Sequence, residues 1–302
     1  MSINAQEEGT DRMAPKQSTW PRENGLFQLP GVQQRLIDAV AATKTPVIEV
    51  LINGGPLSLT PPADASKFAI LEAFYGAQAC GDGIADIMFG KVSPSGKMPI
   101  SCYADAIQAG NITSMDMSKG RTYRYLQGQP TYEFGFGLTF TTWGYSALHT
   151  NSSAAFETDT VRVSLTVSNT GGVDAAQVVQ LYASLSADFA SSLAGISEHV
   201  APRQLANFEK VFVRAGSALD VSLDFTPTAL AGWELWHRPK ATLHLAVGDV
   251  SPTARTLAAR SMQTAAIEVR RGSASSIVPL EHDAPETGPH VGDRTREFES
   301  ED

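Results

Sequence analysis

Residues 120–143, GRTYRYLQGQPTYEFGFGLTFTTW, are the stretch around which the rest of the chain is organised. The β-branched and aromatic side chains of residues 122–125, bracketed by glycine and proline, predict a short strand. Residues 133–138 then interleave aromatic side chains with glycines, so that two backbones can approach closely while a ring fills the gap. This pattern indicates a chain that leaves one compact domain and lies against the next. An ordinary surface loop with aromatic packing is the alternative.

Strand and helix patterns alternate before this stretch. Residues 29–31 precede a predicted helix with four apolar side chains on one face: Val32, Leu36, Ile37 and Val40. The nearly continuous apolar run at residues 47–52 predicts a strand covered on both faces. A second strand is expected at residues 68–75, a helix at 78–89 with Ile84, Ile87 and Met88 toward the core, and a strand-like segment at 98–103. This order predicts part of a parallel, twisted sheet.

After residue 146 the hydrophobic period changes to strict alternation. Val161, Val163, Leu165 and Val167 alternate with polar side chains, which predicts a half-buried strand. Further short strands separated by turn signals predict a β-sandwich, and residues 265–269 predict a marginal extra strand. The expected organisation is an irregular N-terminal loop with an insertion (1–28), a partial α/β domain (29–146), a β-sandwich domain (147–250) and a mostly disordered acidic tail (251–302).

The stretch at 120–143 closely resembles the end of the second domain of glycoside hydrolase family 3, most of all its β-xylosidase branch. SNTGGVDAAQVVQLYASL (168–185) and RQLANFEKVFVRAGSALDVSLDF (203–225) resemble the family's third domain, and WELWHRPKATLHLAVGD (233–249) resembles its closing strands. The resemblance covers most of the chain up to about Asp249. It implies the fold class α/β plus all-β: a truncated parallel-sheet α/β sandwich followed by a fibronectin-III-like β-sandwich, with the family's catalytic barrel absent.

Two acidic residues near the N-terminus are the catalytic candidates that the resemblance implies. Retaining glycosidases use two carboxylates about 5 Å apart, one as nucleophile and one as acid/base. In the family the nucleophile is an aspartate on the barrel, and the second domain lends a glutamate from an EAEGxDR-type loop. QEEGTDR at residues 6–12 resembles that loop, which makes Glu8 the candidate acid/base and Glu7 the second choice. Gln6 stands where some relatives have an earlier glutamate, and solvated charges at a chain end are the structural alternative.

The surroundings of this loop depart from the family pattern. A buried strand precedes the loop in the family, and we expect that strand to be missing here. Residues 13–28 form an insertion, either a long loop or translated non-coding sequence. Asp11 and Arg12 are expected to form a structural ion pair rather than a substrate clamp.

Several other motifs have both a functional and a structural interpretation. Residues 53–56, NGGP, could cradle a ligand or form a tight turn, and residues 81–83, GDG, indicate a closely packed helix rather than a phosphate loop. Arg121 and Arg124 could stack on sugar or pair with acids across a domain interface, and we favour the interface. Three tryptophans could form a carbohydrate platform, although core packing is commoner: Trp143, Trp233 and Trp236.

Composition excludes several classes of function. The formal net charge of −9 argues against nucleic-acid binding, and no apolar run is long enough to span a bilayer. Residues 1–10 do not have the pattern of a signal peptide. Six scattered histidines and two cysteines, Cys80 and Cys102, predict no metal site, and the cysteines are expected to be buried free thiols. Asn111 and Asn151 fit the N-glycosylation pattern, which favours a secretory origin.

The resemblance implies a fragment of an exo-acting retaining β-glycosidase, most of all a xylan 1,4-β-xylosidase acting on xylo-oligosaccharides without an organic cofactor. It also implies an extracellular location. Because one carboxylate cannot form a glycosyl-enzyme intermediate alone, these residues are expected to be inactive by themselves. A non-catalytic carbohydrate-binding or structural module is the alternative. The sugar recognised by the intact enzyme stays open between xyloside, glucoside and arabinoside.

Overall fold

The computed structural model describes residues 2–4, 29–55, 57, 65–110, 114–185, 201–230, 240–251 and 262–270. Expectations for other residues lie outside this described part. The chain divides into two compact units, Met1–Arg271 and Gly272–Asp302, and all described residues belong to the first.

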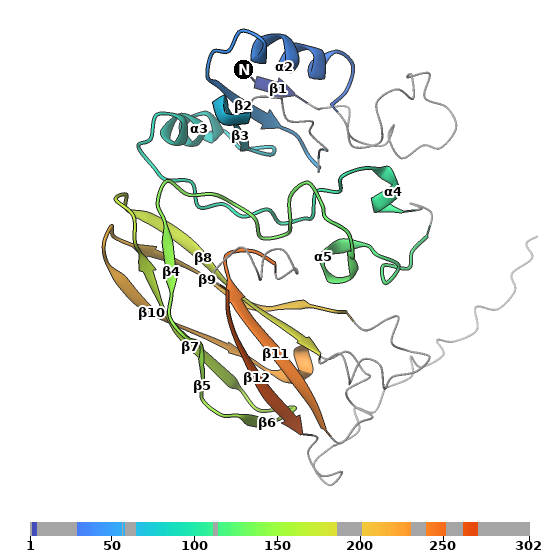
Figure 1. The fold of residues 1–302 in the computed structure, drawn as a ribbon, viewed down its shortest axis with the longest axis vertical. Coiled ribbons are helices and arrows are strands. Elements are labelled where there is room, and N and C mark those ends of the chain that lie inside the picture. Colours follow the sequence, from blue (N-terminus) through green and yellow to red (C-terminus); the bar gives the residue numbers. More distant parts are fainter. Residues whose placement is uncertain are drawn as a thin grey trace, which may run out of the picture. The chain divides into compact units, whose positions relative to one another are not determined.

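The N-terminal part of the first unit contains a parallel sheet of three strands with the order β1-β2-β3 (Figure 1). Its elements are β1 (Ser2–Asn4), α2 (Gln33–Ala41), β2 (Val47–Ile52), the 3-10 helix η1 (Ala65–Lys67), β3 (Phe68–Glu72) and α3 (Cys80–Met88). The expected parallel sheet is therefore confirmed, and β2 has the bounds that the apolar run predicts. β3 ends at Glu72, earlier than expected, because the backbone turns at Phe74, where φ is 49°.

One expectation about this sheet is wrong. We expected no strand before the loop that carries Glu7 and Glu8, yet β1 precedes it and pairs in parallel with β2, from Ser2↔Val50 to Asn4↔Ile52. Three residues are enough to form this strand, because β2 is an apolar strand that pairs with β3 on one side and can bond a short strand on the other.

The core of this sheet is small. Leu29, Ile37, Leu51 and Leu57 form its buried cluster, with Phe68 and Ile70 packed against them. Of the face predicted for α2, only Ile37 is buried, whereas Val32 is 65% exposed and Leu36 50% exposed. No residue of α3 is fully buried, and Met88 is 38% exposed. Both helices thus have a partly uncovered apolar face within the described part of the chain.

The segment between α3 and the β-sandwich contains two further corrections. Residues 122–125, predicted as a strand, form the single helical turn α5 (Thr122–Tyr125), closed by a hydrogen bond from Leu126 N to Thr122 O of 3.0 Å. Residues 98–103, predicted as strand-like, contain only an isolated bridge between Cys102 and Tyr132. Another single turn, α4 (Ala106–Ala109), is capped by Asp105, whose carboxylate accepts from Gln108 N.

Residue contacts explain why α5 replaces the predicted strand. Tyr123 stacks on Phe134 with 4.1 Å between ring centroids, and both rings meet Tyr182 edge-on. The hydroxyl of Tyr123 accepts a hydrogen bond from Leu205 N at 3.0 Å. The aromatic side chains thus contact a neighbouring sheet instead of forming a strand of their own, because tertiary contacts override local propensity. Residues 120–143 thus lie against a sheet formed by later parts of the chain, through the contacts of Tyr123 with Tyr182 and Leu205.

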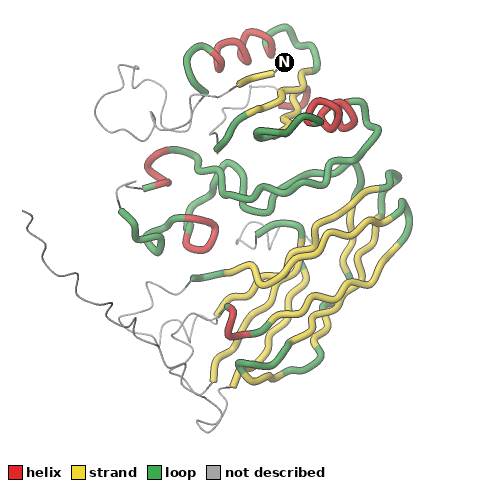
Figure 2. Tube along the Cα trace, turned by 180° about the vertical axis from the view of Figure 1, so that it is seen from behind, coloured by secondary structure: helices red, strands yellow, loops and turns green. Residues whose placement is uncertain are grey.

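The remaining strands form two sheets (Figure 2). One has the order β10-β7-β4, with β5 also paired to β7, and the other has the order β6-β12-β11-β8-β9. Their bounds are β4 (Trp143–Tyr145), β5 (His149–Thr150), β6 (Ala154–Phe156), β7 (Val161–Asn169), β8 (Ala175–Leu185), β9 (Gln204–Val213), β10 (Ala218–Phe225), β11 (Lys240–Gly248) and β12 (Gln263–Arg270), with the 3-10 helix η3 (Pro227–Ala229) after β10. The marginal strand expected at residues 265–269 is the eight-residue β12, which extends its sheet beyond residue 250.

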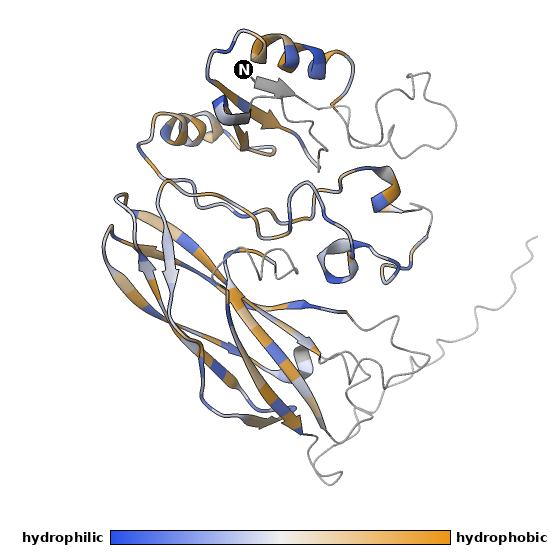
Figure 3. Cartoon of the chain, in the orientation of Figure 1, coloured by the Kyte–Doolittle hydropathy of each residue, from blue (hydrophilic) through white to orange (hydrophobic). Residues whose placement is uncertain are grey.

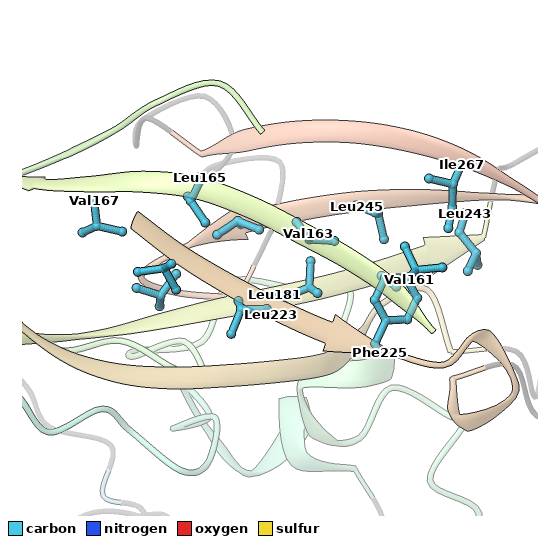
Figure 4. Close-up of a cluster of buried hydrophobic side chains, with 14 of the residues drawn as sticks. Val161, Val163, Leu165, Val167, Leu181, Leu223, Phe225, Leu243, Leu245 and Ile267 are labelled. Carbon is cyan, nitrogen blue, oxygen red and sulfur yellow. The ribbon is translucent and has the colours of Figure 1, made fainter. Parts of the chain in front are cut away.

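A single hydrophobic cluster joins the inner faces of these two sheets (Figure 4). Val161, Val163, Leu165 and Val167 of β7 are at most 3% exposed, as their alternation predicts. Leu181 of β8, Leu223 of β10 and Leu245 of β11 pack in the same cluster. Hydrophobic and hydrophilic residues alternate along the strands (Figure 3). The predicted β-sandwich is confirmed in its two-sheet architecture.

Candidate functional site

The carboxyl edge of the parallel sheet is the candidate site. In open α/β sheets, ligands bind beyond the carboxyl ends of the strands. Asn53 follows β2 at this edge, and Glu72 is the last residue of β3. β1 ends here too, at Asn4, which pairs with Ile52, the residue before Asn53. Glu7 and Glu8 themselves lie outside the described residues.

Asn53 connects the turn after β2 with β3. Its Nδ2 donates to Gly55 O at 2.7 Å and to Glu72 Oε2 at 3.4 Å. The side chain is fully buried, and its Oδ1 has no hydrogen-bond partner among the described residues. A buried amide oxygen without a partner is costly, so this acceptor is available for an N–H or O–H group that reaches the edge of the sheet.

Glu72 shapes the turn after β3. Its Oε1 accepts a hydrogen bond from Phe74 N at 3.2 Å, and Ala73 N donates to Leu51 O at 3.0 Å. These contacts hold Phe74 at a φ of 49°, a left-handed conformation that costs free energy for a bulky residue.

The NGGP motif at residues 53–56 forms a close contact with the next loop, within its described part. A Cβ added at Gly54 would lie 2.8 Å from the ring of Tyr75. Gly54 therefore allows the two turns to approach, which supports the tight-turn interpretation and also packs the turns side by side at the candidate site.

Three titratable groups lie near this edge: Glu49 and Cys102 are buried, and Tyr132 is half-buried. Glu49, in the middle of β2, is only 1% exposed, and burial raises its pKa to about 7. Burial, followed by the charge of Glu72, raises the pKa of the Cys102 thiol to about 12. Burial also raises the pKa of Tyr132, with Cys102, Glu49 and Glu72 adding to the effect. Cys102 is therefore an uncharged thiol and not a nucleophile at neutral pH.

Several predicted site residues cannot be placed. Asp11, Arg12, Trp233, Trp236 and Asn111 lie outside the described residues, so their roles stay predictions. Asn151 lies on the surface, where its Oδ1 accepts from Arg162 N at 3.0 Å.

The placed arginines and tryptophan have structural contacts. Arg121 donates to the backbone oxygens of Ala109 and Ser114, so these bonds lie within its own loop region and not across the predicted interface. Arg124 is exposed. Trp143 is half-buried against the sandwich core, and its Nε1 donates to Thr139 Oγ1 at 3.0 Å.

The GDG motif and the cysteines need smaller corrections. Gly81 and Gly83 lie in helix α3 as predicted, but among the described residues no atom beyond the helix's own backbone would contact a Cβ at either position, so close packing there does not require them. Both cysteines are free, as expected, although Cys80 is only partly buried.

Sequence reasoning missed three residues. Glu49 interrupts an otherwise apolar strand, and Glu72 ends the next one, so a charged residue at each place was a visible signal. Arg203 donates from Nη2 to Leu126 O at 3.0 Å, and thus joins two segments that are distant in the sequence. Nothing in the local pattern around Arg203 indicates this partner.

The described residues contain no group of three or more His, Cys, Asp or Glu side chains that could hold a metal ion. None of the helices described is both long enough and apolar enough to cross a membrane.

The fold defines the class: a parallel α/β sheet connected through residues 120–143 to a two-sheet β-sandwich. The family model of the glycosyl hydrolase family 3 C-terminal domain matches residues 2–140. The chain belongs to glycoside hydrolase family 3, of which it contains this C-terminal domain.

Similar proteins with glycosidase names agree with this family assignment. The chain is 35% identical over 202 residues to a β-xylosidase of Formosa agariphila, a match that covers 65% of the chain and 26% of the relative. It is 33% identical over 216 residues to a periplasmic β-glucosidase of Salmonella typhimurium, covering 68% and 27%. A solved structure of a β-glucosidase from Erythrobacter marinus is also similar, with a TM-score of 0.61 and 28% identity. This match covers 80% of the present chain and 30% of the β-glucosidase chain. The chain thus spans less than a third of the length of each.

Proposed function

We propose that this chain is the C-terminal part of an exo-acting retaining β-glycosidase, with xylo-oligosaccharides as the substrate. The observation that carries the proposal is the family match over residues 2–140, which includes the sheet edge from which β1 leads toward Glu7 and Glu8. Similarity to the Formosa agariphila β-xylosidase favours xyloside, and similarity to the Salmonella typhimurium enzyme makes glucoside the competing sugar.

In this proposal Glu8 is the acid/base, and Glu7 is the second choice. The acid/base protonates the leaving oxygen and then activates the water that hydrolyses the glycosyl-enzyme intermediate. On the family resemblance, the nucleophile is an aspartate of the barrel that precedes this region. We therefore expect these 302 residues alone to give little or no turnover.

The β-sandwich is proposed to be fibronectin-III-like. Its strand order supports this: β4, β7 and β10 share one sheet, while β8, β9, β11 and β12 share the other, as in sandwiches with Greek-key connections. An extracellular location, and glycosylation at Asn111 or Asn151, complete the proposal.

A chimera tests the catalytic role. The barrel region of the Formosa agariphila β-xylosidase, fused ahead of residue 1, is expected to hydrolyse aryl β-xylosides, whereas the unfused chain is not. Glu8→Gln in the chimera should lower kcat/KM about 100-fold or more for substrates with poor leaving groups while sparing kcat/KM for activated aryl xylosides, because only the former need protonation of the leaving oxygen. It should also lower kcat for the activated aryl xylosides, because hydrolysis of the glycosyl-enzyme intermediate needs the base. Glu7→Gln is the matched control and should leave both rates unchanged.

Each result has a clear meaning. Turnover by the unfused chain at the rate of the chimera would refute the need for a separate nucleophile. Sensitivity to Glu7→Gln but not Glu8→Gln would move the acid/base to Glu7. Two chimeras test the sugar, one with a xylosidase barrel and one with a glucosidase barrel. If both hydrolysed aryl β-glucosides faster than aryl β-xylosides, xyloside would be refuted as the sugar that this part favours.

A further inference from the structure

A cavity of about 330 Å³ lies where residues 137–145 meet the sandwich strands β8 and β11. Its volume is at the lower end of the range for small-molecule sites, which suits a ligand of one or two rings. Strand β4, which supplies two of its aromatic side chains, is labelled in Figure 1.

Trp143 and Tyr145 form the aromatic part of the cavity lining. Both are half-buried and pack against the sandwich core, so their rings are supported on the protein side. The indole Nε1 of Trp143 donates to Thr139 Oγ1 at 3.0 Å, and the hydroxyl of Tyr145 accepts from Gln177 Nε2 at 3.0 Å. Gln177 is fully buried, so it fixes Tyr145 firmly. The rings are therefore preorganised before any ligand arrives.

The polar part of the lining selects the charge of the ligand. Thr139 and Thr141 place hydroxyls at the lining, where the Thr139 hydroxyl is bonded to Thr141 O and Trp143 Nε1 and the Thr141 hydroxyl donates to Asn169. Asp249 is the single charged residue among the described lining residues. A carboxylate with neighbouring hydroxyls accepts hydrogen bonds from O–H donors and repels anions. A neutral ring with many hydroxyls and an apolar C–H face matches both the aromatic and the polar side.

We propose that this cavity is a binding site for a neutral pyranose unit of an oligosaccharide, which stacks on Trp143 and donates hydroxyl hydrogen bonds to Asp249. The site uses only residues of this chain, so it does not depend on the proposed hydrolase activity.

Titration of the purified chain with xylotriose and cellotriose, followed by calorimetry and saturation-transfer NMR, tests the site directly. We expect saturable binding with a Kd on the order of 1 mM, because a small site offers few contacts. Asp249→Asn should weaken binding about tenfold, since a hydrogen bond to a charged acceptor contributes more than one to a neutral acceptor. Glucuronate should bind more weakly than glucose or xylose.

Two further variants separate binding from folding. Leu138→Trp enlarges an exposed lining side chain and should abolish binding without unfolding the chain, because Leu138 is 67% exposed. Phe212→Leu, at an exposed ring of β9 outside the lining, is the control and should bind as the parent does. Absence of saturable binding, or binding that neither Asp249→Asn nor Leu138→Trp changes, would overturn the proposal and leave the cavity as a packing space. Hydrolysis by the chain would contradict its proposed inactivity but not this site.

Discussion

The side-chain amide of Gln180 joins residues 133–138, in which aromatic residues and glycines alternate, to the β-sandwich through Gly135. Gln180 Nε2 donates to Gly135 O at 3.1 Å and to Asp249 O at 3.0 Å, and Tyr182 Oη donates to Gln180 Oε1. Gln180 is only 3% exposed, so all these bonds are shielded from water. Gly135 N also donates to Met98 O, which connects the same residue to the preceding segment.

Gly135→Ala should destabilise the chain by about 2–4 kcal/mol, measured by urea unfolding. An added Cβ would meet Gln180 Oε1 in the folded chain, and φ at Gly135 is 79°, so the substitution displaces the amide and strains the backbone. Gly90→Ala is the matched control because its φ is 71° but no atom of the described residues lies within 4 Å of its Cβ position. It should cost only about 1 kcal/mol, from backbone strain alone. Equal losses in the two variants would contradict the role of Gln180.

Sequence patterns predicted the elements whose formation depends on local periodicity. Residues 47–52 and the alternating apolar residues of β7 form the strands that their hydrophobic patterns predict. Burial of these side chains is what stabilises the strand conformation, so the local pattern is sufficient. Residues 122–125 also had strand propensity, yet Tyr123 turns toward Tyr182 and Leu205, which are distant in sequence. No local window contains those partners, so the helical turn could not be predicted.

Phe134→Ala should destabilise the chain by about 2–3 kcal/mol, because it removes a half-buried ring and its stacking on Tyr123. Its ring lies 4.1 Å from that of Tyr123, at an interplanar angle of 14°. Phe208→Ala, at a ring that is 61% exposed on β9, should change the free energy of unfolding by no more than about 0.5 kcal/mol. A loss at Phe208 as large as that at Phe134 would show that burial does not determine the effect.

The candidate site was predicted only in part for a similar reason. The resemblance pointed to residues 6–12, whereas the contact between Asn53 and Glu72 joins two strand ends that are 19 residues apart. The turn at Asn53 was recognised from its glycines, but its partner depends on the parallel register of β2 and β3, which no turn motif encodes.

Burial of Glu49 should make stability depend on pH. Its pKa rises from 4.5 to about 7 on folding, so between these values the folded chain binds more protons than the unfolded chain. The free energy of unfolding should therefore fall as pH rises through this window, by roughly 3 kcal/mol in total. Glu49→Gln should remove this fall, as measured by urea unfolding from pH 4.5 to 8. Glu209→Gln, at an exposed position of β9, should preserve it, and a profile unchanged by Glu49→Gln would contradict the assignment.

Asn53→Asp should destabilise the chain at neutral pH by about 1–3 kcal/mol. The amide Nδ2 that donates to Glu72 Oε2 at 3.4 Å would be replaced by an acceptor, which leaves two carboxylates facing each other. Repulsion raises the pKa of such a pair in the folded state, so the loss should shrink as pH falls and one carboxylate becomes protonated. Adding Glu72→Gln should restore most of the stability at neutral pH, because its amide can donate where Asn53 did. The double-mutant cycle isolates this coupling. Additive effects of the two substitutions would mean that Asn53 and Glu72 do not interact, and the carboxyl edge of the sheet would then lose the contact that joins β2 to β3 at the candidate site.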